Sequence, residues 1–201
     1  MRLHEMFLLF VLGARGHRAL RRHRRELAHG LAAAVLLDLE RGGRIVLRRN
    51  EVFVRNAGPA EDRVGDAFLE RLLLGERAPD PETCLRDAPD VVDDVVDQLL
   101  ATGHVAWVSP PPRRPFRRPR LEPTACSPAA RLHALVQDAA HTGGTTRDDI
   151  AVLTVLLGAA RLIGPAAAPP HAGPASSALG VTAHALARRI AAEFTPLAFG
   201  G

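Results

Sequence analysis

The chain has 201 residues, of which 47% are hydrophobic, and its 26 basic residues stand against 22 acidic ones. This length and hydrophobic share support one well-buried core, and we predict a single domain over residues 1–201. The basic residues are all arginine, which is typical of a GC-rich bacterial genome. The positive charge by itself therefore does not indicate nucleic-acid binding.

Cysteine spacing and apolar run lengths exclude further classes of protein. Cys84 and Cys126 lie far apart and outside any CxxC pair, which argues against a disulfide scaffold and a zinc site and fits a reducing cytoplasm. The apolar run Met6 to Leu12 is too short for a secretory signal, and no run approaches the roughly 20 apolar residues that span a bilayer. We expect any membrane contact to be peripheral.

The first third of the chain predicts two helices and a hairpin. Apolar residues recur at helical spacing from Leu3 to Leu12, and an arginine-rich segment from Arg15 to Arg25 follows, which we expect to be a solvated connection. The unbroken apolar run Leu31 to Leu37 predicts a helix buried on every side, ended by two glycines. Alternating apolar residues from Ile45 to Val54 then predict a β-hairpin that turns at residues 49–51.

The middle of the chain predicts two more helices and a second hairpin. Asp66 is the expected N-cap of a short apolar helix. The segment from Asp87 to Gly103 predicts an amphipathic helix whose aspartates form a solvated face rather than a metal site. The strand HVAWV and the segment after Arg120 predict the arms of the second hairpin, with the tip SPPPRRPFRRPR.

The last third predicts three helices. They run from Pro128 to Ala140, from a cap at Thr146 to Ile163, and from Val181 to Phe194, the last with Arg188 and Arg189 facing outward. Residues 165–177 are rich in Pro, Ala, Gly and Ser and predict a flexible linker. The expected fold is mainly α: a helical bundle around a buried central helix, with two peripheral β-hairpins.

Catalytic and cofactor motifs are missing from the sequence. We find no GxSxG, HExxH, GxGxxG or phosphate-binding glycine loop, so we predict a protein that is not an enzyme and has no cofactor and no metal. His133, Gln137 and His141 share a helix face, but they lack a carboxylate or cysteine at ligand spacing. We expect them to be surface and turn residues rather than metal ligands.

Two arginine clusters are the most unusual feature of the sequence. Arginine side chains match phosphate oxygens, and aromatic residues on a proline-stiffened tip can enter a headgroup layer. Trp107 and Phe116 are therefore the expected membrane-inserting residues. The expected lipid-headgroup-binding residues are Arg21, Arg22, Arg24, Arg25, Arg113, Arg114, Arg117 and Arg118.

Several weak motifs, taken in order, resemble the Golgi phosphoprotein 3 family over nearly the whole chain. The segments are LHEMFLLFVL, GLAAAVLLDLERGGRIVL, VGDAFLERLLL, VVDDVVDQLLATGHV and DDIAVLTVLLGAARLIG. The resemblance implies a mostly helical domain with hairpins on one face. In eukaryotic members it implies a peripheral membrane adaptor that binds phosphatidylinositol 4-phosphate and retains glycosyltransferases.

The same resemblance locates a headgroup pocket, built in those members from one tryptophan and three arginines. The four positions fall near His23, Ala32, Pro89 and Val92, and none of the four residues is retained. The resemblance also implies that the second hairpin contributes to membrane contact and to self-association, so we expect homo-oligomers through this hairpin.

The leading hypothesis is a non-enzymatic peripheral protein at the inner, cytoplasmic face of a membrane. Its partners would be anionic lipids and a membrane-protein or enzyme client. The first alternative is a soluble protein-interaction module without lipid affinity. A nucleic-acid binder is the weaker alternative, because a helix followed by a hairpin resembles a winged helix but no recognition helix with base-reading residues is evident.

Overall fold

The computed structural model describes residues 1–48, 50–75, 78–88, 90–109, 119–142, 148–163 and 178–194. This part of the chain is mainly helical, with two small antiparallel hairpins, as predicted. The helices are α1 (Leu3–Arg15), α2 (Arg18–Arg22), α3 (Arg24–Arg41), α4 (Arg63–Leu74), α5 (Pro81–Arg86), α6 (Val91–Ala101), α7 (Ala129–Thr142), α8 (Asp148–Ala159) and α9 (Ala178–Glu193). The strands are β1 (Ile45–Arg48), β2 (Glu51–Val54), β3 (Val105–Val108) and β4 (Arg120–Pro123).

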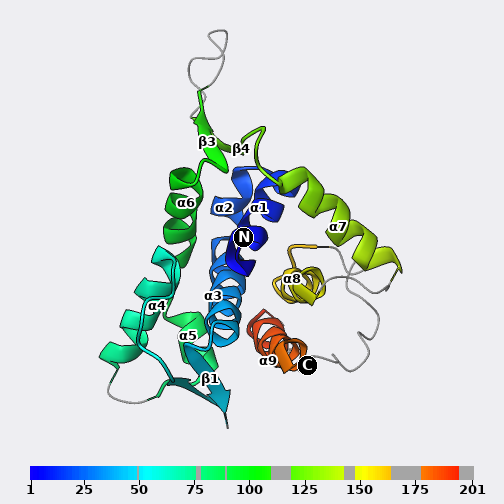
Figure 1. Cartoon of the computed structure of the whole chain (residues 1–201). Helices are drawn as coiled ribbons and strands as arrows, with labels where there is room; N and C mark the ends of the chain where they lie inside the picture. The colour runs from blue at the N-terminus through cyan, green and yellow to red at the C-terminus, as the bar shows by residue number, and fades with distance from the viewer. Residues whose placement is uncertain are drawn as a thin grey trace, which may run out of the picture.

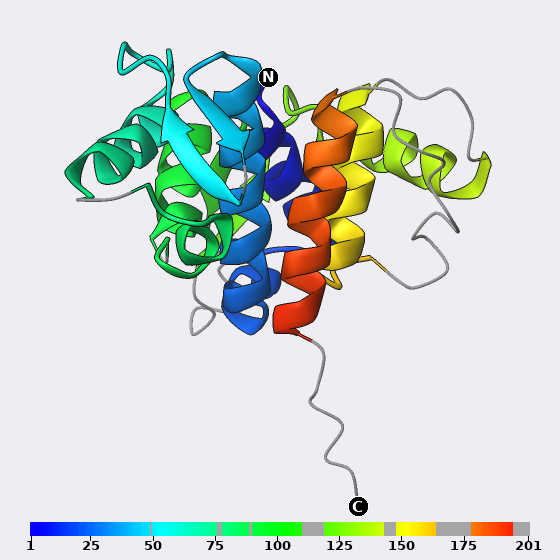
Figure 2. The same ribbon diagram turned by 90° about the horizontal axis from the view of Figure 1, so that it is seen from below.

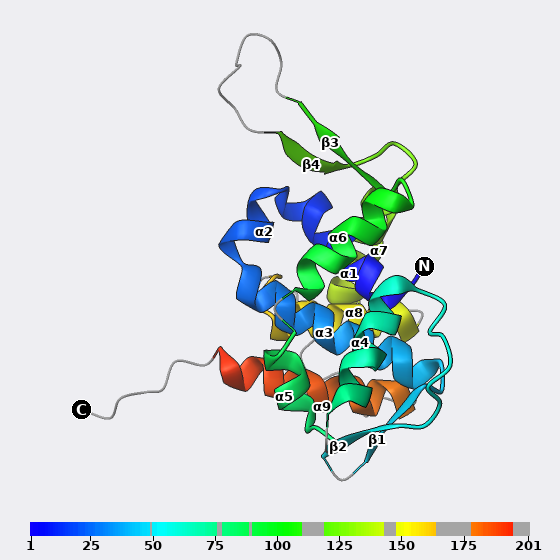
Figure 3. The same cartoon turned by 90° about the vertical axis from the view of Figure 1, so that its left-hand side faces the viewer.

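Helices α1 and α3 form the middle of the molecule. Helices α4, α5 and α6 lie on one side of them, and α7, α8 and α9 lie on the other (Figures 1 and 2). Buried side chains from all of these helices join one hydrophobic cluster. The two hairpins lie at opposite ends of the molecule, with β3 and β4 at the top of Figure 3 and β1 and β2 at the bottom. The bundle thus separates two exposed ends.

Helices α1 and α3 pack closely because one of the residues at their contact is a glycine. Gly30 of α3 faces the ring of Phe7 of α1, and a Cβ built on Gly30 would lie 2.9 Å from Cε2 of that ring and nearer still to Cζ. Phe7 is fully buried, as are Leu8 and Leu9 on the other sides of α1. The sequence predicted only α3 to be buried all round, whereas α1 shares that position.

Polar side chains form a buried hydrogen-bond network around the N-terminal end of α1. His4 is 0% exposed, and its Nδ1 lies 2.8 Å from Oδ2 of Asp38 on α3. The same carboxylate accepts hydrogen bonds from the backbone N–H groups of Leu3 and His4. Asp38 therefore caps α1 from a different helix, which satisfies donors that a helix start leaves open. Gln98 of α6 extends this network by donating to Glu5 Oε1 over 2.8 Å.

Several predicted boundaries need correction. Asp62 caps α4 by accepting from the Gly65 N–H over 2.7 Å, whereas Asp66, the predicted cap, lies inside the helix and accepts from the Ala60 N–H. The predicted arginine-rich connection forms α2 and the first turn of α3. Pro81 opens α5 at a position where its missing N–H costs nothing.

Helix α6 starts at Val91, later than predicted, because the chain first completes α5. On α9, Arg189 is not simply outward: it contacts Asn50 of the first hairpin and lies 4.0 Å from Glu82. The predicted cap Thr146 and the predicted linker over residues 165–177 lie outside the described residues.

Candidate functional site

The second hairpin and α2 lie together at one end of the molecule, which we call the hairpin end: residues 12–22, 105–108 and 120–123 (Figure 3). The ring of Trp107 on β3 meets the ring of His17 edge-on, with centroids 5.4 Å apart. This contact joins segments far apart in the sequence.

Apolar and basic side chains are both exposed at the hairpin end. Trp107 is 53% exposed and Val108 is 45% exposed, both on β3. Arg21 and Arg22 of α2 are exposed, and no ion pair is found for either among the described residues. These two arginines and Trp107 are therefore available to an external ligand.

Arg24 and Arg25 lie in a different environment from Arg21 and Arg22. Arg24 donates to both oxygens of Asp93 on α6, at 3.2 and 2.5 Å, and this hydrogen-bonded carboxylate raises the pKa of the guanidinium. Arg25 lies 3.4 Å from Glu193 and 5.8 Å from the centre of the Phe194 ring. A headgroup that bound either arginine would have to displace these contacts.

Glu193 links Arg25 to a second helix. Arg86 of α5 donates to Glu193 over 3.2 Å, and this hydrogen bond lowers the pKa of the Glu193 carboxyl group. The cluster ties α3, α5 and α9 together on the surface. Arg25 and Arg86 therefore already have an acidic partner within the protein.

The other predicted site residues lie outside the described part of the chain. These are Arg113, Arg114, Arg117, Arg118 and Phe116, which lie between β3 and β4 in the sequence. Their assignment to headgroup binding and membrane insertion stays a prediction.

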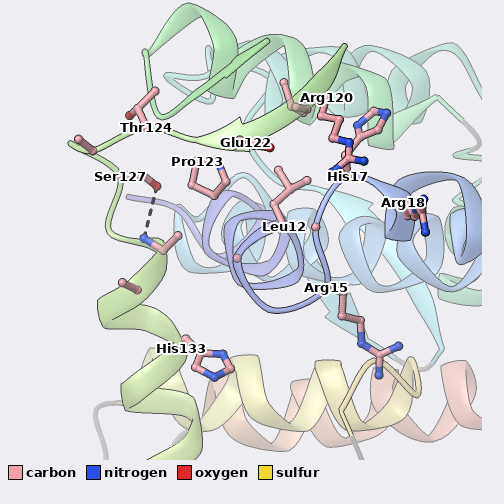
Figure 4. Close-up of a pocket in the computed structure, with 16 residues that line it drawn as sticks. Leu12, Arg15, His17, Arg18, Arg120, Glu122, Pro123, Thr124, Ser127 and His133 are labelled. Atoms are coloured by element: carbon pink, nitrogen blue, oxygen red, sulfur yellow. Dashed lines mark hydrogen bonds between the residues drawn. The ribbon is translucent and has the colours of Figure 1, made fainter. Parts of the chain in front are cut away.

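A hollow opens at the hairpin end between the turn after α1, strand β4 and helix α7 (Figure 4). Its volume is about 1050 Å³. Arg15 and Arg18 line it from the α1–α2 turn, Arg120 lines it from β4, and Glu122 is the acidic residue in its described lining. We call this hollow the cationic cavity.

Two histidines complete the cationic cavity. His17 lies beside Arg120, and His133 reaches it from α7 (Figure 4). His133 is not the surface residue expected from the sequence, because its ring stacks on Phe10 with centroids 5.5 Å apart. The Nδ1 atoms of both histidines are buried and have no hydrogen-bond partner in the described structure.

A family model described as Golgi phosphoprotein 3 (GPP34) matches residues 3–193. The chain belongs to the Golgi phosphoprotein 3 family. The match begins with α1 and ends with α9, so it includes every element of the bundle and both hairpins. No curated protein matches the chain.

The positions that the sequence resemblance assigned to the headgroup pocket of the Golgi phosphoprotein 3 family hold neither the tryptophan nor the arginines of that pocket. Ala32 and Val92 are inside the core, His23 is half-buried, and Pro89 lies outside the described residues. The Arg24–Asp93 ion pair lies directly beside two of these positions in sequence. Basic residues available for a ligand lie instead on α2 and around the cationic cavity.

Sequence reasoning did not assign Arg15, Arg18, His17, Arg120 or His133 to a site. The arginines were visible as members of basic clusters, but their grouping depends on the approach of β4 to the α1–α2 turn. That approach is tertiary and has no local signal. Within the described part of the chain, no helix is long and apolar enough to cross a membrane.

Proposed function

We propose that the protein is a non-enzymatic peripheral adaptor that binds the anionic surface of a membrane through its hairpin end. The observation that carries the proposal is that exposed Trp107 and Val108 share the hairpin end with Arg21 and Arg22, for which no ion pair is found within the described part of the chain. Membership of the Golgi phosphoprotein 3 family fits a lipid-binding or adaptor role. The adaptor would hold a membrane-protein or enzyme client at the inner face of the membrane.

Two physical effects combine in this mode of attachment. Arginines near an anionic leaflet each contribute about 1 kcal/mol to binding, and a tryptophan is stabilised at the boundary between water and acyl chains. Arg21 and Arg22 supply the first effect, and Trp107 supplies the second. The hairpin tip, with Arg113, Arg114, Arg117, Arg118 and Phe116, would add to both.

We propose generic recognition of anionic lipid rather than selective recognition of phosphatidylinositol 4-phosphate. Ala32 and Val92 are apolar and buried where the family resemblance places arginines, and Arg24 is bonded to Asp93. Neither arrangement presents a ready phosphate site at those positions. Attachment would therefore follow the charge of the membrane.

Co-sedimentation with vesicles tests the proposal. Neutral vesicles, generic anionic vesicles, and vesicles with phosphatidylinositol 4-phosphate at matched charge are compared. We expect equal binding to the two anionic sets and none to the neutral set. A clear preference for the phosphoinositide would contradict generic recognition, and binding to a protein partner without vesicle affinity would favour a soluble interaction module.

Matched variants locate the membrane-binding surface. Replacing Arg21 and Arg22 by glutamate removes about 2 kcal/mol of attraction, so we expect vesicle affinity to fall about 30-fold or more. The control reverses Arg48 and Arg188, which are exposed on β1 and α9 away from the hairpin end. Reversal of Arg113, Arg114, Arg117 and Arg118 measures the tip separately. Equal loss in the control and in the Arg21/Arg22 variant would mean that net charge, and not this surface, drives binding.

A further inference from the structure

Helix α4 ends in two exposed leucines at the side of the molecule. Leu73 is 52% exposed and Leu74 is 79% exposed, whereas Phe68 and Leu69 on the inner face of the same helix are buried. The C-terminal end of α4 projects at the left of Figures 1 and 2, away from the hairpin end. A single exposed leucine is common on a protein surface, but adjacent ones that border an apolar hollow indicate a contact surface.

A small apolar pocket lies beside these leucines, and we call it the α4 pocket. Phe68 and Leu72 line it from α4, and Cys84 and Ala88 line it from α5 and the residues that follow. Burial raises the pKa of the Cys84 thiol to about 12, so the thiol is uncharged at neutral pH and forms part of the apolar wall.

The volume of the α4 pocket restricts what it can hold. The pocket encloses about 240 Å³, which is less than the roughly 300–1,000 Å³ of sites that take small molecules and cofactors. Apolar side chains of another protein surface are small enough to enter. The exposed leucines at the end of α4 are side chains of this kind.

The charges of the α4 pocket are complementary to each other. Arg71 and Asp87 both line the pocket and are both exposed. Arg71 lies 3.2 Å from Asp94, in a partly exposed ion pair that contributes little to stability. No ion pair is found for Asp87 in the described part of the chain. A second copy that met this surface would bring an Asp87 to Arg71 and an Arg71 to Asp87.

We propose that the end of α4 is a self-association surface that joins two copies of the chain about a two-fold axis. Leu73 and Leu74 of each copy enter the α4 pocket of the other, and Arg71 of each copy lies opposite Asp87 of the other. Because the protruding leucines and the pocket belong to one patch, the contact closes with two copies instead of growing into a filament. This surface is separate from the second hairpin, through which the sequence resemblance predicted homo-oligomers.

The contact leaves the hairpin end of each copy uncovered. A two-fold axis that runs vertically in Figure 1 would point both hairpin ends in the same direction. Two linked attachments bind one membrane more tightly than a single attachment does. This consequence rests on the proposed membrane attachment, whereas the self-association does not and is measured without vesicles.

Sedimentation equilibrium of the full chain tests the proposal. We expect a monomer–dimer equilibrium at micromolar concentrations, and we expect Leu74→Lys to raise the dissociation constant at least about 30-fold. Val181→Lys is the matched control, because it places the same charge at an exposed apolar position of α9 and should leave the dissociation constant unchanged. A chain that stays monomeric at all concentrations, or equal losses in both variants, would overturn the proposal.

Reversal of the arginines between β3 and β4 distinguishes this surface from the second hairpin. The variant replaces Arg113, Arg114, Arg117 and Arg118 by glutamate. We expect it to form dimers as the unaltered chain does. Loss of the dimer in this variant, with retention of the dimer in Leu74→Lys, would place the interface at the second hairpin and overturn the proposal.

An exchange of charge tests the two-fold arrangement itself. Arg71→Asp and Asp87→Arg each bring like charges together across the axis, so we expect each variant alone to dimerise at least about tenfold more weakly. In an equal mixture of the two variants, both contacts join opposite charges again. We expect the mixture to recover a dissociation constant within about threefold of the unaltered chain. A mixture as weak as the separate variants, with both folded by circular dichroism, would overturn the arrangement.

Discussion

The two ends of helix α1 differ in whether the polar and charged side chains there have partners within the protein. At the N-terminal end, His4, Glu5 and Asp38 are buried or nearly so and are hydrogen-bonded to one another or to the backbone. At the C-terminal end, Arg15 and the nearby Arg18 of α2 line an open cavity and have no carboxylate partner in the described structure. Polar groups that hold the fold therefore lie at one end of α1, and polar groups that are available to a ligand lie at the other.

This difference indicates where a polar residue contributes to stability and where it contributes to binding. A buried polar group that loses its partner costs more than an exposed one, because water no longer reaches it. An exposed cation surrounded by other cations contributes little to the fold and gains most from an added anion. Each prediction below changes one side of this contrast.

The largest expected effect follows from Asp38→Ala. This change leaves the N–H groups of Leu3 and His4 and the His4 ring without their acceptor. We expect the free energy of unfolding to fall by about 3 kcal/mol, measured by urea denaturation. Asp97→Ala, at an exposed position of α6, should change it by less than about 0.5 kcal/mol. Similar losses in both variants would contradict the contrast.

Gly30→Ala is expected to be the next most damaging change. The new methyl group would meet the buried Phe7 ring, and overpacking of this kind costs about 1–3 kcal/mol. Gly13→Ala is the control, because its methyl group would lie 3.4 Å from Ala129 Cβ at an ordinary packing distance. Thermal unfolding of both variants checks the order. A tolerated Gly30→Ala would mean that the helices separate more easily than their packing indicates.

Asp93→Ala tests whether an arginine that is now held in an ion pair can take part in membrane binding. It frees Arg24, which adds one arginine to those available near α2. We expect anionic-vesicle affinity to rise about fivefold, from about 1 kcal/mol per arginine. The exposed ion pair itself should contribute less than about 1 kcal/mol to stability. Unchanged vesicle binding would exclude Arg24 from the membrane surface.

The smallest expected effect is on the stability of cavity variants. Replacing Arg15, Arg18 and Arg120 together by glutamine should change the free energy of unfolding by no more than about 0.5 kcal/mol, because none of them has an ion pair in the described structure. Urea denaturation in low salt measures this change. A large loss would show that the arginines hold the fold, as the residues at the other end of α1 do.

Local patterns in the sequence were sufficient for most of the fold. The apolar run from Leu31 to Leu37 predicted the buried helix, and the alternation from Ile45 to Val54 predicted the first hairpin. Glu51, which was predicted to lie in the turn, instead begins β2 and pairs with Arg48. Boundaries were less accurate where two residues compete for one role. Asp62 and Asp66 both have the chemistry of an N-cap, and only the path of the preceding chain decides between them.

The candidate site was less predictable from the sequence than the fold. Composition identified the basic clusters, but it could not separate Arg24, which has Asp93 as a partner 69 residues away, from Arg21, which has no ion pair in the described part of the chain. The cationic cavity depends on three segments that meet only after packing. Its histidines look unremarkable in sequence because their environment comes from Phe10 and Trp107.

The Phe7–Gly30 contact also fixes how far α1 is able to slide along α3. A shift by one helical turn, about 5.4 Å, would push the Phe7 ring against a residue with a side chain and would withdraw the Leu3 and His4 N–H groups from Asp38. The same shift would move Arg15 by one turn relative to β4. The position of α1 along α3 is therefore fixed by Gly30, and this position in turn determines where Arg15 lies relative to β4.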